Sequence, residues 1–334
     1  MLTVRGLSEF PPAERSPRGK IGEQAGDKPP GDSVLALGTF DGLHLGHQQV
    51  IRHAVAHAHG SGTRSVAVTF EPHPLEVLRP GIDPVLLSTL DERVALLSNL
   101  RVDVALVLPF DLEFSQTPAH VWLDGVLAER LGARAVFAGS SYTFGYRREG
   151  TAQRLAEWGR ARGIEVHLVP AVLVDGEPVS SSRIRSALRE GLVDEAARLL
   201  GRYYSLQGRV AAGAGRGRTI GFPTANLAVD SPRKILPGVG VYATIATVGG
   251  RRYGGATNVG RRPTFGGGQI TVETHLLEFD VRGSVVGEPF LVEFVRRIRE
   301  ERAFSGPEEL GRQIARDVAQ VRELLATVGP GIIR

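Results

Sequence analysis

The feature that most constrains the fold is a change of pattern near residue 200. Before it, short apolar runs alternate with segments of helical periodicity. After it, strand-like segments follow one another with Gly and Pro between them. Strands that alternate with helices predict a parallel sheet with helices on both faces, whereas consecutive strands predict a small barrel or sandwich. We therefore expect two domains of different architecture in the 334 residues.

The predicted elements of the first half alternate between strand and helix. Its strands are expected at Ser33–Phe40, Arg64–Phe70, Val102–Leu108, Arg134–Ala138 and Glu165–Val169, and its helices at Gly46–His59, Asp91–Leu100, Thr117–Arg130, Ala152–Arg162 and 183–200. Later strands are expected at Tyr204–Val210, Val241–Val248, Arg252–Asn258, Ile270–Phe279 and Pro289–Val295, before a helix from Glu308 to about Ala326. We expect an extended arm over 1–30, an α/β domain over 31–186, a linker helix over 187–202 and a barrel domain over 203–334.

Composition excludes several classes of protein. The chain has no cysteine, which excludes disulfides, thiolate metal sites and a cysteine nucleophile. No apolar run reaches the roughly 18 residues that span a bilayer, and the N-terminus lacks a signal-peptide core, so we expect a cytoplasmic protein without membrane contact. The pI is 9.7, but 40 basic and 36 acidic residues leave a net charge of only +4. Because the arginines are dispersed, no nucleic-acid partner is expected; the oligomeric state stays open.

The first candidate site is the segment Gly38-Thr-Phe-Asp-Gly-Leu-His-Leu-Gly-His47, between a predicted strand and helix. Ligands of open α/β sheets bind beyond the carboxyl ends of strands, where a helix N-terminus offers N–H groups to phosphate. Its glycines permit tight turns. His44 and His47 can point the same way and stabilise charge on an α-phosphate during adenylyl transfer. A metal-binding pair and helix-capping histidines are the alternatives. The later histidines of this helix are expected to be surface residues: His53, His57 and His59.

A second segment supports this site. Ser180-Ser-Ser-Arg-Ile-Arg185 opens a helix, and hydroxyls with arginine at a helix start form an anion-binding group. These two segments, with Thr69-Phe-Glu-Pro-His-Pro74 between them, closely resemble the adenylyltransferase half of bacterial bifunctional riboflavin kinase/FAD synthetases, a family of HxGH nucleotidyltransferases. The resemblance implies that the two histidines engage ATP phosphates. It also implies that a Ser-Ser-x-x-Arg group closes the site, here Ser181, Ser182 and Arg185.

One segment departs from the family pattern. Gly139-Ser-Ser-Tyr-Thr-Phe-Gly145 has Ser141 where the family commonly has Asn or Asp, and Tyr142 where it has Phe. The departure leaves open a riboflavin kinase whose adenylyltransferase half is degenerate. A different HxGH nucleotidyltransferase is the other alternative. Plain core packing is an equal interpretation of Tyr142 and Phe144.

The second candidate site is the glycine-rich segment 215–227, GRGRTIGFPTANL. Its glycines can wrap phosphate, although it lacks the Gly-Lys-Ser/Thr ending of a Walker A loop. Thr224 and Asn226 offer oxygen atoms, the ligands that Mg²⁺ prefers beside ATP phosphates. The alternative is a glycine-rich hairpin with ordinary turn residues.

A carboxylate in a later strand completes this second site. Within Thr271-Val-Glu-Thr-His275, strand alternation puts Glu273 and His275 on one face. An inward Glu273 could take the proton from a substrate hydroxyl during phosphoryl transfer. A solvated strand face is the alternative.

The second half resembles the riboflavin kinase domain of the same family, a small β-barrel with a C-terminal helix. The segments that carry this resemblance are GFPTANL, Pro237–Tyr242, Asn258–Phe265, Val272–Leu276 and Arg299–Phe304. The resemblance implies that Thr224 and Asn226 hold ATP and Mg²⁺, and that Glu273 is the base for the terminal ribityl hydroxyl. The other residues expected to contact ATP in the two halves are Gly38, Phe40, Asp41, Gly42, Gly46, Gly221, Pro223 and Asn258.

Together the two resemblances cover about residues 31–325 and imply a bifunctional enzyme of flavin-cofactor synthesis. The C-terminal domain is expected to phosphorylate riboflavin to FMN. The N-terminal domain is expected to adenylylate FMN to FAD with release of pyrophosphate. The expected substrates are therefore riboflavin, FMN and ATP, with Mg²⁺ as the cofactor.

Overall fold

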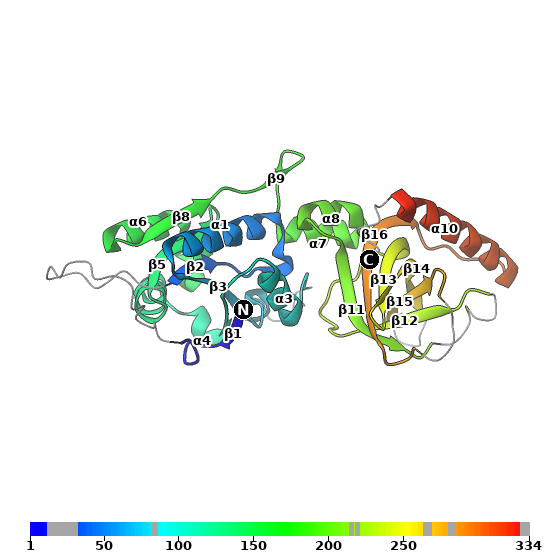
Figure 1. Ribbon diagram of the computed structural model, residues 1–334, viewed down its shortest axis with the longest axis horizontal. Coiled ribbons are helices and arrows are strands. Elements are labelled where there is room, and N and C mark those ends of the chain that lie inside the picture. The colour runs from blue at the N-terminus through cyan, green and yellow to red at the C-terminus, as the bar shows by residue number, and fades with distance from the viewer. Residues whose placement is uncertain are drawn as a thin grey trace. The chain divides into compact units, whose positions relative to one another are not determined.

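A computed structural model of the chain describes residues 1–11, 33–79, 81, 86–213, 217, 221–262, 269–279 and 285–327. Contacts divide the chain into two units, Met1–Ser180 and Ser181–Arg334, whose elements Figure 1 labels. Most of the predicted arm and of the predicted phosphate-wrapping loop 215–220 lies outside the described residues. The limits proposed for the domains stay a prediction.

The first unit is built on a parallel sheet, as predicted. In the described part of the chain six strands lie in the order β1-β4-β3-β2-β5-β8, and each pairs with its neighbours in parallel. The strands are β1 (Leu2–Arg5), β2 (Ser33–Leu37), β3 (Arg64–Glu71), β4 (Val104–Pro109), β5 (Ala133–Gly139) and β8 (Glu165–Val169). The chain leaves β2 first toward β3 and later crosses to β5 on its other side. The topological switch point, where such sheets bind ligands, therefore lies at the carboxyl ends of β2 and β5.

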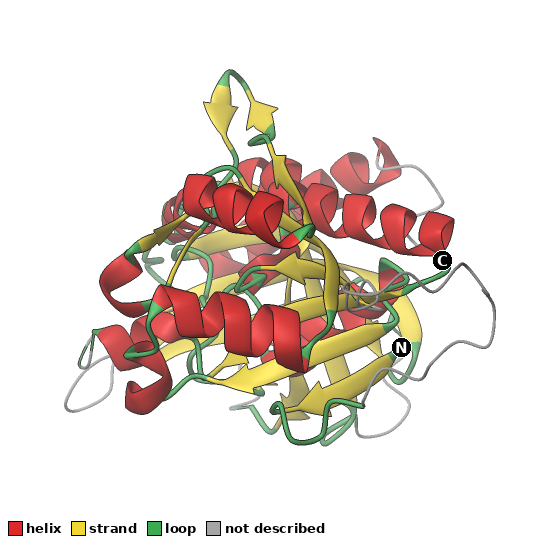
Figure 2. Cartoon of the chain, turned by 90° about the vertical axis from the view of Figure 1, so that its left-hand side faces the viewer, coloured by secondary structure: helices red, strands yellow, loops and turns green. Residues whose placement is uncertain are grey.

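Helices cover both faces of this sheet (Figure 2). They are α1 (Leu45–Ser61), α2 (Pro74–Leu78), α3 (Leu90–Asn99), α4 (Leu112–Ser115), α5 (Ala119–Val121), a π-helix (Trp122–Arg130) and α6 (Ala152–Arg162). Val34 and Ala36 of β2 share a core with α1, whereas Leu35 and Leu37 share another with Trp122. Burial on both faces explains why β2 is apolar without alternation.

Short elements complete this unit. Two 3₁₀ turns lie at Asp41–Leu43 and Tyr146–Arg148. Two small hairpins pair β6 (Thr143–Phe144) with β7 (Gly150–Thr151), and β9 (Leu173–Val174) with β10 (Glu177–Pro178).

Three parts of the first unit differ most from the prediction. Residues Leu2–Arg5 are an edge strand and not part of an arm, because Val4 packs into the core while the segment pairs with β4. The strand predicted at 33–40 ends at Leu37, since Phe40 and Gly42 adopt φ angles of 51° and 74° and turn the chain. The helix predicted at 117–130 begins at Ala119 and continues as the π-helix.

The second unit is a closed antiparallel barrel, as predicted, with strand order β11-β12-β15-β14-β13-β16. Its strands are β11 (Tyr204–Ala211), β12 (Thr224–Val229), β13 (Gly240–Val248), β14 (Arg251–Arg262), β15 (Gln269–Leu276) and β16 (Pro289–Arg299). The prediction missed β12, because glycine and proline dominate the sequence that leads into it. The helix α10 (Pro307–Thr327) packs on the outside of the barrel, where Arg299 donates to the Asp317 carboxylate at 2.7–3.0 Å.

The single helix predicted over 183–200 is two helices, α7 (Ser181–Arg189) and α8 (Val193–Leu200). Gly191 separates them with a φ of 78°, and a Cβ added there would lie 2.7 Å from the Tyr242 hydroxyl oxygen. Only glycine avoids both conflicts at this position. Arg183 of α7 and Glu195 of α8 then form an ion pair at 3.1 Å.

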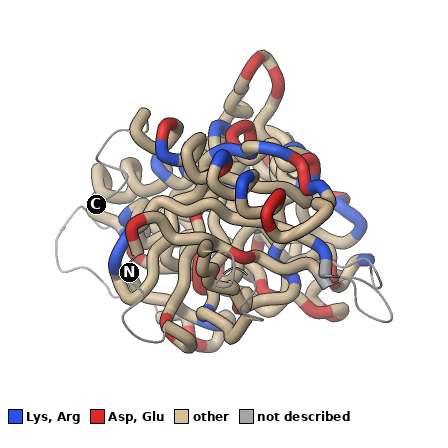
Figure 3. The backbone as a smooth tube through the Cα atoms, turned by 90° about the vertical axis from the view of Figure 1, so that its right-hand side faces the viewer, with Lys and Arg blue, Asp and Glu red and all other residues tan. Residues whose placement is uncertain are grey.

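On the side of the molecule that Figure 3 shows, basic and acidic residues are interspersed. This agrees with the dispersed arginines of the sequence. None of the helices within the described ranges combines the length and the apolar character needed to cross a bilayer. The predicted absence of a nucleic-acid partner stays a prediction.

Candidate active sites

The first candidate site is the turn from β2 into α1, where two imidazoles meet. His44 caps α1, since its Nδ1 accepts a hydrogen bond from the His47 N–H at 3.3 Å. The two rings stack with their centroids 3.6 Å apart and their planes 18° from parallel. The prediction that they point the same way is therefore confirmed, and His44 is also the capping residue that the alternative proposed. In the neutral ring this cap leaves the proton of His44 on Nε2, as a hydrogen-bond donor.

The turn is held by a buried carboxylate. Asp41 is fully buried and accepts hydrogen bonds from the N–H groups of Leu87, at 3.1 Å, and Ser88, at 2.9 Å. The Ser88 hydroxyl accepts in turn from the Gly42 N–H at 2.8 Å. These bonds give Asp41 a structural role in fixing the turn, beside its predicted contact with ATP.

Two glycines of this turn give the aromatic rings room. A Cβ added at Gly46 would lie 3.2 Å from the His44 ring, and one at Gly38 would lie 2.7 Å from the Phe40 ring. The Phe40 ring meets the edge of His47 at 5.4 Å between centroids. The packing of the Phe40 ring therefore requires glycine at position 38, and the packing of the His44 ring favours glycine at position 46.

A buried arginine that the sequence analysis did not select lies beside this turn. Arg93 of α3 is fully buried and donates from Nη1 to Thr69 Oγ1, at 3.1 Å, and to the Phe70 carbonyl, at 2.9 Å. Its Nη2 lies 3.7 Å from the carboxylate of Glu71. Burial lowers the pKa of Arg93, and the carboxylates of Asp41 and Glu71 oppose that shift. The only signal in the sequence was a charged residue on the buried face of its helix.

The aromatic segment after β5 packs largely into the core. Phe144 is buried in the core, and Tyr142 stacks on it with the centroids 5.5 Å apart. Burial raises the pKa of Tyr142, so its hydroxyl stays protonated. Ser141, at the position where the segment departs from the family pattern, is exposed. The core-packing interpretation therefore holds for Phe144.

The Ser-Ser-x-x-Arg group opens a helix, as predicted. Ser181 and Ser182 stand in the first turn of α7 and Arg185 in the next. The contacts assign this helix to the second unit. The role of these three residues toward ATP stays a prediction.

The second candidate site is a row of polar side chains across three strands of the barrel. Asn226 of β12 and Asn258 of β14 both pair with Glu273 of β15, which lies between them. Paired residues project to the same side of a sheet. Thr257 and Thr274, their neighbours in sequence, are fully buried and hydrogen-bond to each other at 2.9 Å inside the barrel. The row therefore faces outward, because side chains alternate along a strand.

The outward direction of the row corrects the prediction for Glu273. The carboxylate was expected to point inward, but it is partly exposed on the outer face of the barrel. The reason is that Val272 and Thr274 take the interior positions of β15. The alternating pattern correctly predicted which residues of β15 share a face. It could not decide which of the two faces is buried.

A histidine and a threonine extend the row. Thr224 pairs with His275, two residues beyond Glu273 on the same face. The Nδ1 of His275 donates to the Pro223 carbonyl at 2.9 Å, and its ring meets the edge of Phe222 at 5.4 Å between centroids. The start of β12 is thereby fixed against β15.

Glycines line the approach to this row. A Cβ added at Gly213 would lie 2.1 Å from Asn226 Nδ2. At Gly260 it would lie 2.5 Å from both Asn258 Nδ2 and Glu301 Oε1. Glu301 is thus a second carboxylate beside the row. Glu301 lies in the segment Arg299–Phe304 that carries the kinase resemblance, although it was not among the predicted site residues.

Comparison with known proteins places both halves in one family. Residues 27–183 match the FAD synthetase family, and residues 200–325 match the riboflavin kinase family. The chain is 37% identical over 291 residues to a bifunctional riboflavin kinase/FMN adenylyltransferase of Bacillus subtilis, which covers 85% of this chain and 90% of that protein. The chain belongs to this family. The Escherichia coli K12 member is 33% identical over 298 residues, which are 89% of this chain and 94% of that one.

A solved structure shares the fold of this family member. It is a crystal structure described as a macrolide-efflux protein from Streptococcus pneumoniae, with 30% identity and a TM-score of 0.83 over 96% of this chain and 99% of that one. Membership in the riboflavin kinase/FMN adenylyltransferase family confirms the predicted fold and the two predicted ATP-dependent activities. It favours them over a different nucleotidyltransferase and over a kinase with a degenerate partner half.

Proposed function

We propose that the two activities use separate sites, with adenylylation of FMN at the His44–His47 turn and phosphorylation of riboflavin on the outer face of the barrel. The observation that carries this division is that each polar group is assembled inside its own unit. The stacked imidazoles stand at the start of α1, and the Asn226–Glu273–Asn258 row spans three neighbouring strands.

The adenylylation step depends on binding and charge stabilisation. The phosphate of FMN attacks the α-phosphorus of ATP, the bond to the β-phosphate oxygen breaks, and FAD and pyrophosphate form. No general base is required, because the attacking phosphate is already ionised. The N-terminus of α1 and the imidazole of His44, whose Nε2 carries the proton, supply donors toward the charge that develops on the α-phosphate. The family resemblance also implies a role in ATP binding for Ser181, Ser182 and Arg185, which belong to the second unit, and that role stays a prediction.

The phosphorylation step requires a proton acceptor. The terminal ribityl hydroxyl attacks the γ-phosphorus of ATP and loses its proton to the carboxylate of Glu273, and FMN and ADP leave. Asn226 and Asn258 flank this carboxylate and orient it with the substrate. Gly221 and Pro223 shape the entry to β12, with Gly221 at a φ of 83°.

The donor set of the barrel face fits Mg²⁺. This ion prefers hard oxygen ligands and needs only one or two from the protein beside ATP phosphates and water. The side chains of Thr224 and Asn226, two residues apart on one face of β12, supply such oxygens next to Glu273. Bound there, Mg²⁺ would offset the negative charge on the phosphates of ATP.

Two substitutions in the full chain test the division. We expect His47→Ala to abolish FAD formation and to leave FMN formation largely intact. Glu273→Ala should abolish FMN formation and retain FAD formation from supplied FMN. His53→Ala, an exposed residue of the same helix as His47, is the matched control. Flavins are separated by chromatography after incubation with MgATP. Loss of both activities from one substitution in a folded protein would refute the two-site assignment.

A further inference from the structure

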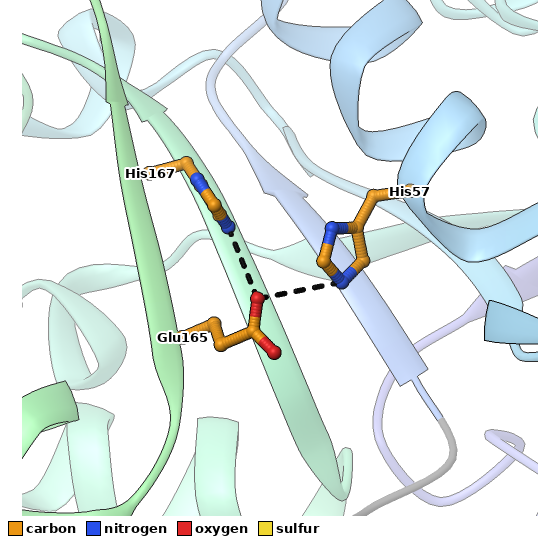
Figure 4. A group of neighbouring side chains, drawn as sticks. All are labelled: His57, Glu165 and His167. Atoms are coloured by element: carbon orange, nitrogen blue, oxygen red, sulfur yellow. Dashed lines mark hydrogen bonds and ion pairs between the residues drawn. The ribbon is translucent and has the colours of Figure 1, made fainter. Parts of the chain in front are cut away.

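Three side chains of the first unit that the flavin reactions do not use converge on one point (Figure 4). His57 comes from α1, and Glu165 and His167 come from the edge strand β8. Glu165 Oε2 lies 3.7 Å from the Nε2 of His57 and 3.4 Å from the Nε2 of His167. All three ligand atoms lie within 4.8 Å of one another.

These separations suit a small divalent metal ion. In a tetrahedral zinc site with bonds of about 2.1 Å, neighbouring ligand atoms lie about 3.4 Å apart. The two distances from the histidine nitrogens to the Glu165 oxygen, 3.7 Å and 3.4 Å, are close to that separation. The remaining nitrogen–nitrogen separation is at most 4.8 Å. Two imidazoles with one carboxylate are also a ligand set that zinc enzymes use, with a fourth position for water.

The two rings are held in place by one aromatic residue. The His167 ring stacks on Phe137 of β5 with the centroids 4.4 Å apart and the planes 11° from parallel. The His57 ring meets the edge of the same phenyl ring at 5.5 Å. Phe137 is itself buried and pairs with His167 across the sheet. Two of the three ligands are therefore positioned before an ion arrives, which lowers the cost of binding.

The group is open to an incoming ion. The side chain of His57 is 25% exposed, that of Glu165 55% and that of His167 45%. An ion can therefore reach the ligands, and water can fill the remaining coordination position. The competing interpretation is that Glu165 only contacts the two imidazoles and that the cluster holds no ion.

We propose that His57, Glu165 and His167 form a binding site for a divalent transition-metal ion of tetrahedral preference, such as Zn²⁺. The ion joins the C-terminal half of α1 to β8. It binds the imidazoles through their unprotonated ring nitrogens. The site is separate from the two flavin sites, and its occupancy does not depend on their assignment.

The test uses the full untagged chain, freed of metal by chelation and kept in excess Mg²⁺ so that oxygen sites are filled. Titration with Co²⁺ is followed by the visible absorption of the tetrahedral ion, and Zn²⁺ is added to displace it. We expect one Co²⁺ per chain at neutral pH, and a rise in the thermal unfolding midpoint with Zn²⁺. His57→Gln and His167→Gln should each weaken Co²⁺ binding by at least roughly 10- to 100-fold. The loss of a residue that only hydrogen-bonds to a metal ligand already has an effect of that size.

Matched controls are available on the same helix. His53 and His59 are exposed and lie outside the cluster, so His53→Gln and His59→Gln should bind Co²⁺ like the wild type. Glu165→Gln changes a largely exposed side chain, which keeps the test valid should a histidine variant fold poorly. Absence of the tetrahedral Co²⁺ spectrum in the wild type would overturn the proposal. So would equal binding by the wild type and all three cluster variants, which would assign the ion to other residues.

Discussion

The sharpest test of the barrel site is Gly213→Ala, which changes no residue of the polar row. The added Cβ would lie 2.1 Å from Asn226 Nδ2. Carbon and nitrogen atoms pack no closer than about 3.5 Å, so the amide must retreat by more than about 1 Å. The amide is the end of a flexible side chain, and its displacement costs little folding stability. We expect the free energy of unfolding to stay within about 1 kcal/mol of the wild type.

The cost in activity is much larger than the cost in stability. A displacement of about 1 Å in a group that positions reactants lowers the rate on the order of 100-fold, which is about 2.7 kcal/mol of transition-state stabilisation. The kcat/KM for riboflavin phosphorylation should therefore fall about 100-fold in Gly213→Ala. Adenylylation of supplied FMN should be unchanged, because that site lies in the other unit.

The assay measures initial rates of FMN formation from riboflavin and MgATP, and of FAD formation from FMN, on the same preparation. Gly311→Ala in α10 is the control, since its added Cβ meets no atom within 4 Å and both rates should match the wild type. A folded Gly213→Ala protein that phosphorylates riboflavin at the wild-type kcat/KM would refute the assignment of Asn226 to the site.

Two further predictions concern stability. Arg93→Met removes two buried hydrogen bonds and leaves carboxylates unneutralised; it should lower the free energy of unfolding by about 3–5 kcal/mol, and an unchanged urea midpoint would contradict this role. Burial raises the pKa of Tyr242 to about 12, whereas an unfolded tyrosine titrates near about 10. Below about pH 10 the Tyr242 hydroxyl is protonated in both the folded and the unfolded state. Between about pH 10 and pH 12 it stays protonated only in the folded state, so the free energy of unfolding falls as pH rises. Tyr242→Phe should reduce that loss in urea midpoints measured across the range, and an unaltered slope would count against the assignment.

The first half could be predicted closely because its central strands β2, β3, β4 and β5 are buried on both faces. Such strands appear as apolar runs, and α1 appears by its periodicity. That His44 and His47 point the same way followed from their spacing of three residues at a helix start, whereas the stacking of their rings is seen only in the structure. The role of Arg93 could not be predicted in this way, because its partners Thr69 and Phe70 lie on a separate strand. Only the packing of α3 against that strand brings them together.

In the second half, the residues of the candidate site could be predicted, but the direction in which they project from the barrel could not. Thr224, Asn226 and Glu273 were selected, and the antiparallel register brings Asn226 opposite Glu273. That register depends on how strands separated by long connections pair, and a slip of one residue would turn every side chain to the other face. The sequence carries the period of β15, whereas the pairing with its neighbours decides which phase is buried.

The outward direction of the Glu273 row follows from what fills the barrel. Tyr242 and Phe294 meet edge to face at 5.3 Å between centroids and are fully buried. Thr244 and Thr257 hydrogen-bond at 2.7 Å, and Thr257 continues to Thr274. A closed barrel of six strands filled by such side chains has no room for a nucleotide. Polar residues that bind a ligand must then occupy the alternate, outward positions of the same strands. Asn226, Asn258 and Glu273 each lie between two buried residues of a barrel strand, which is why the candidate site is on the outer surface of this unit.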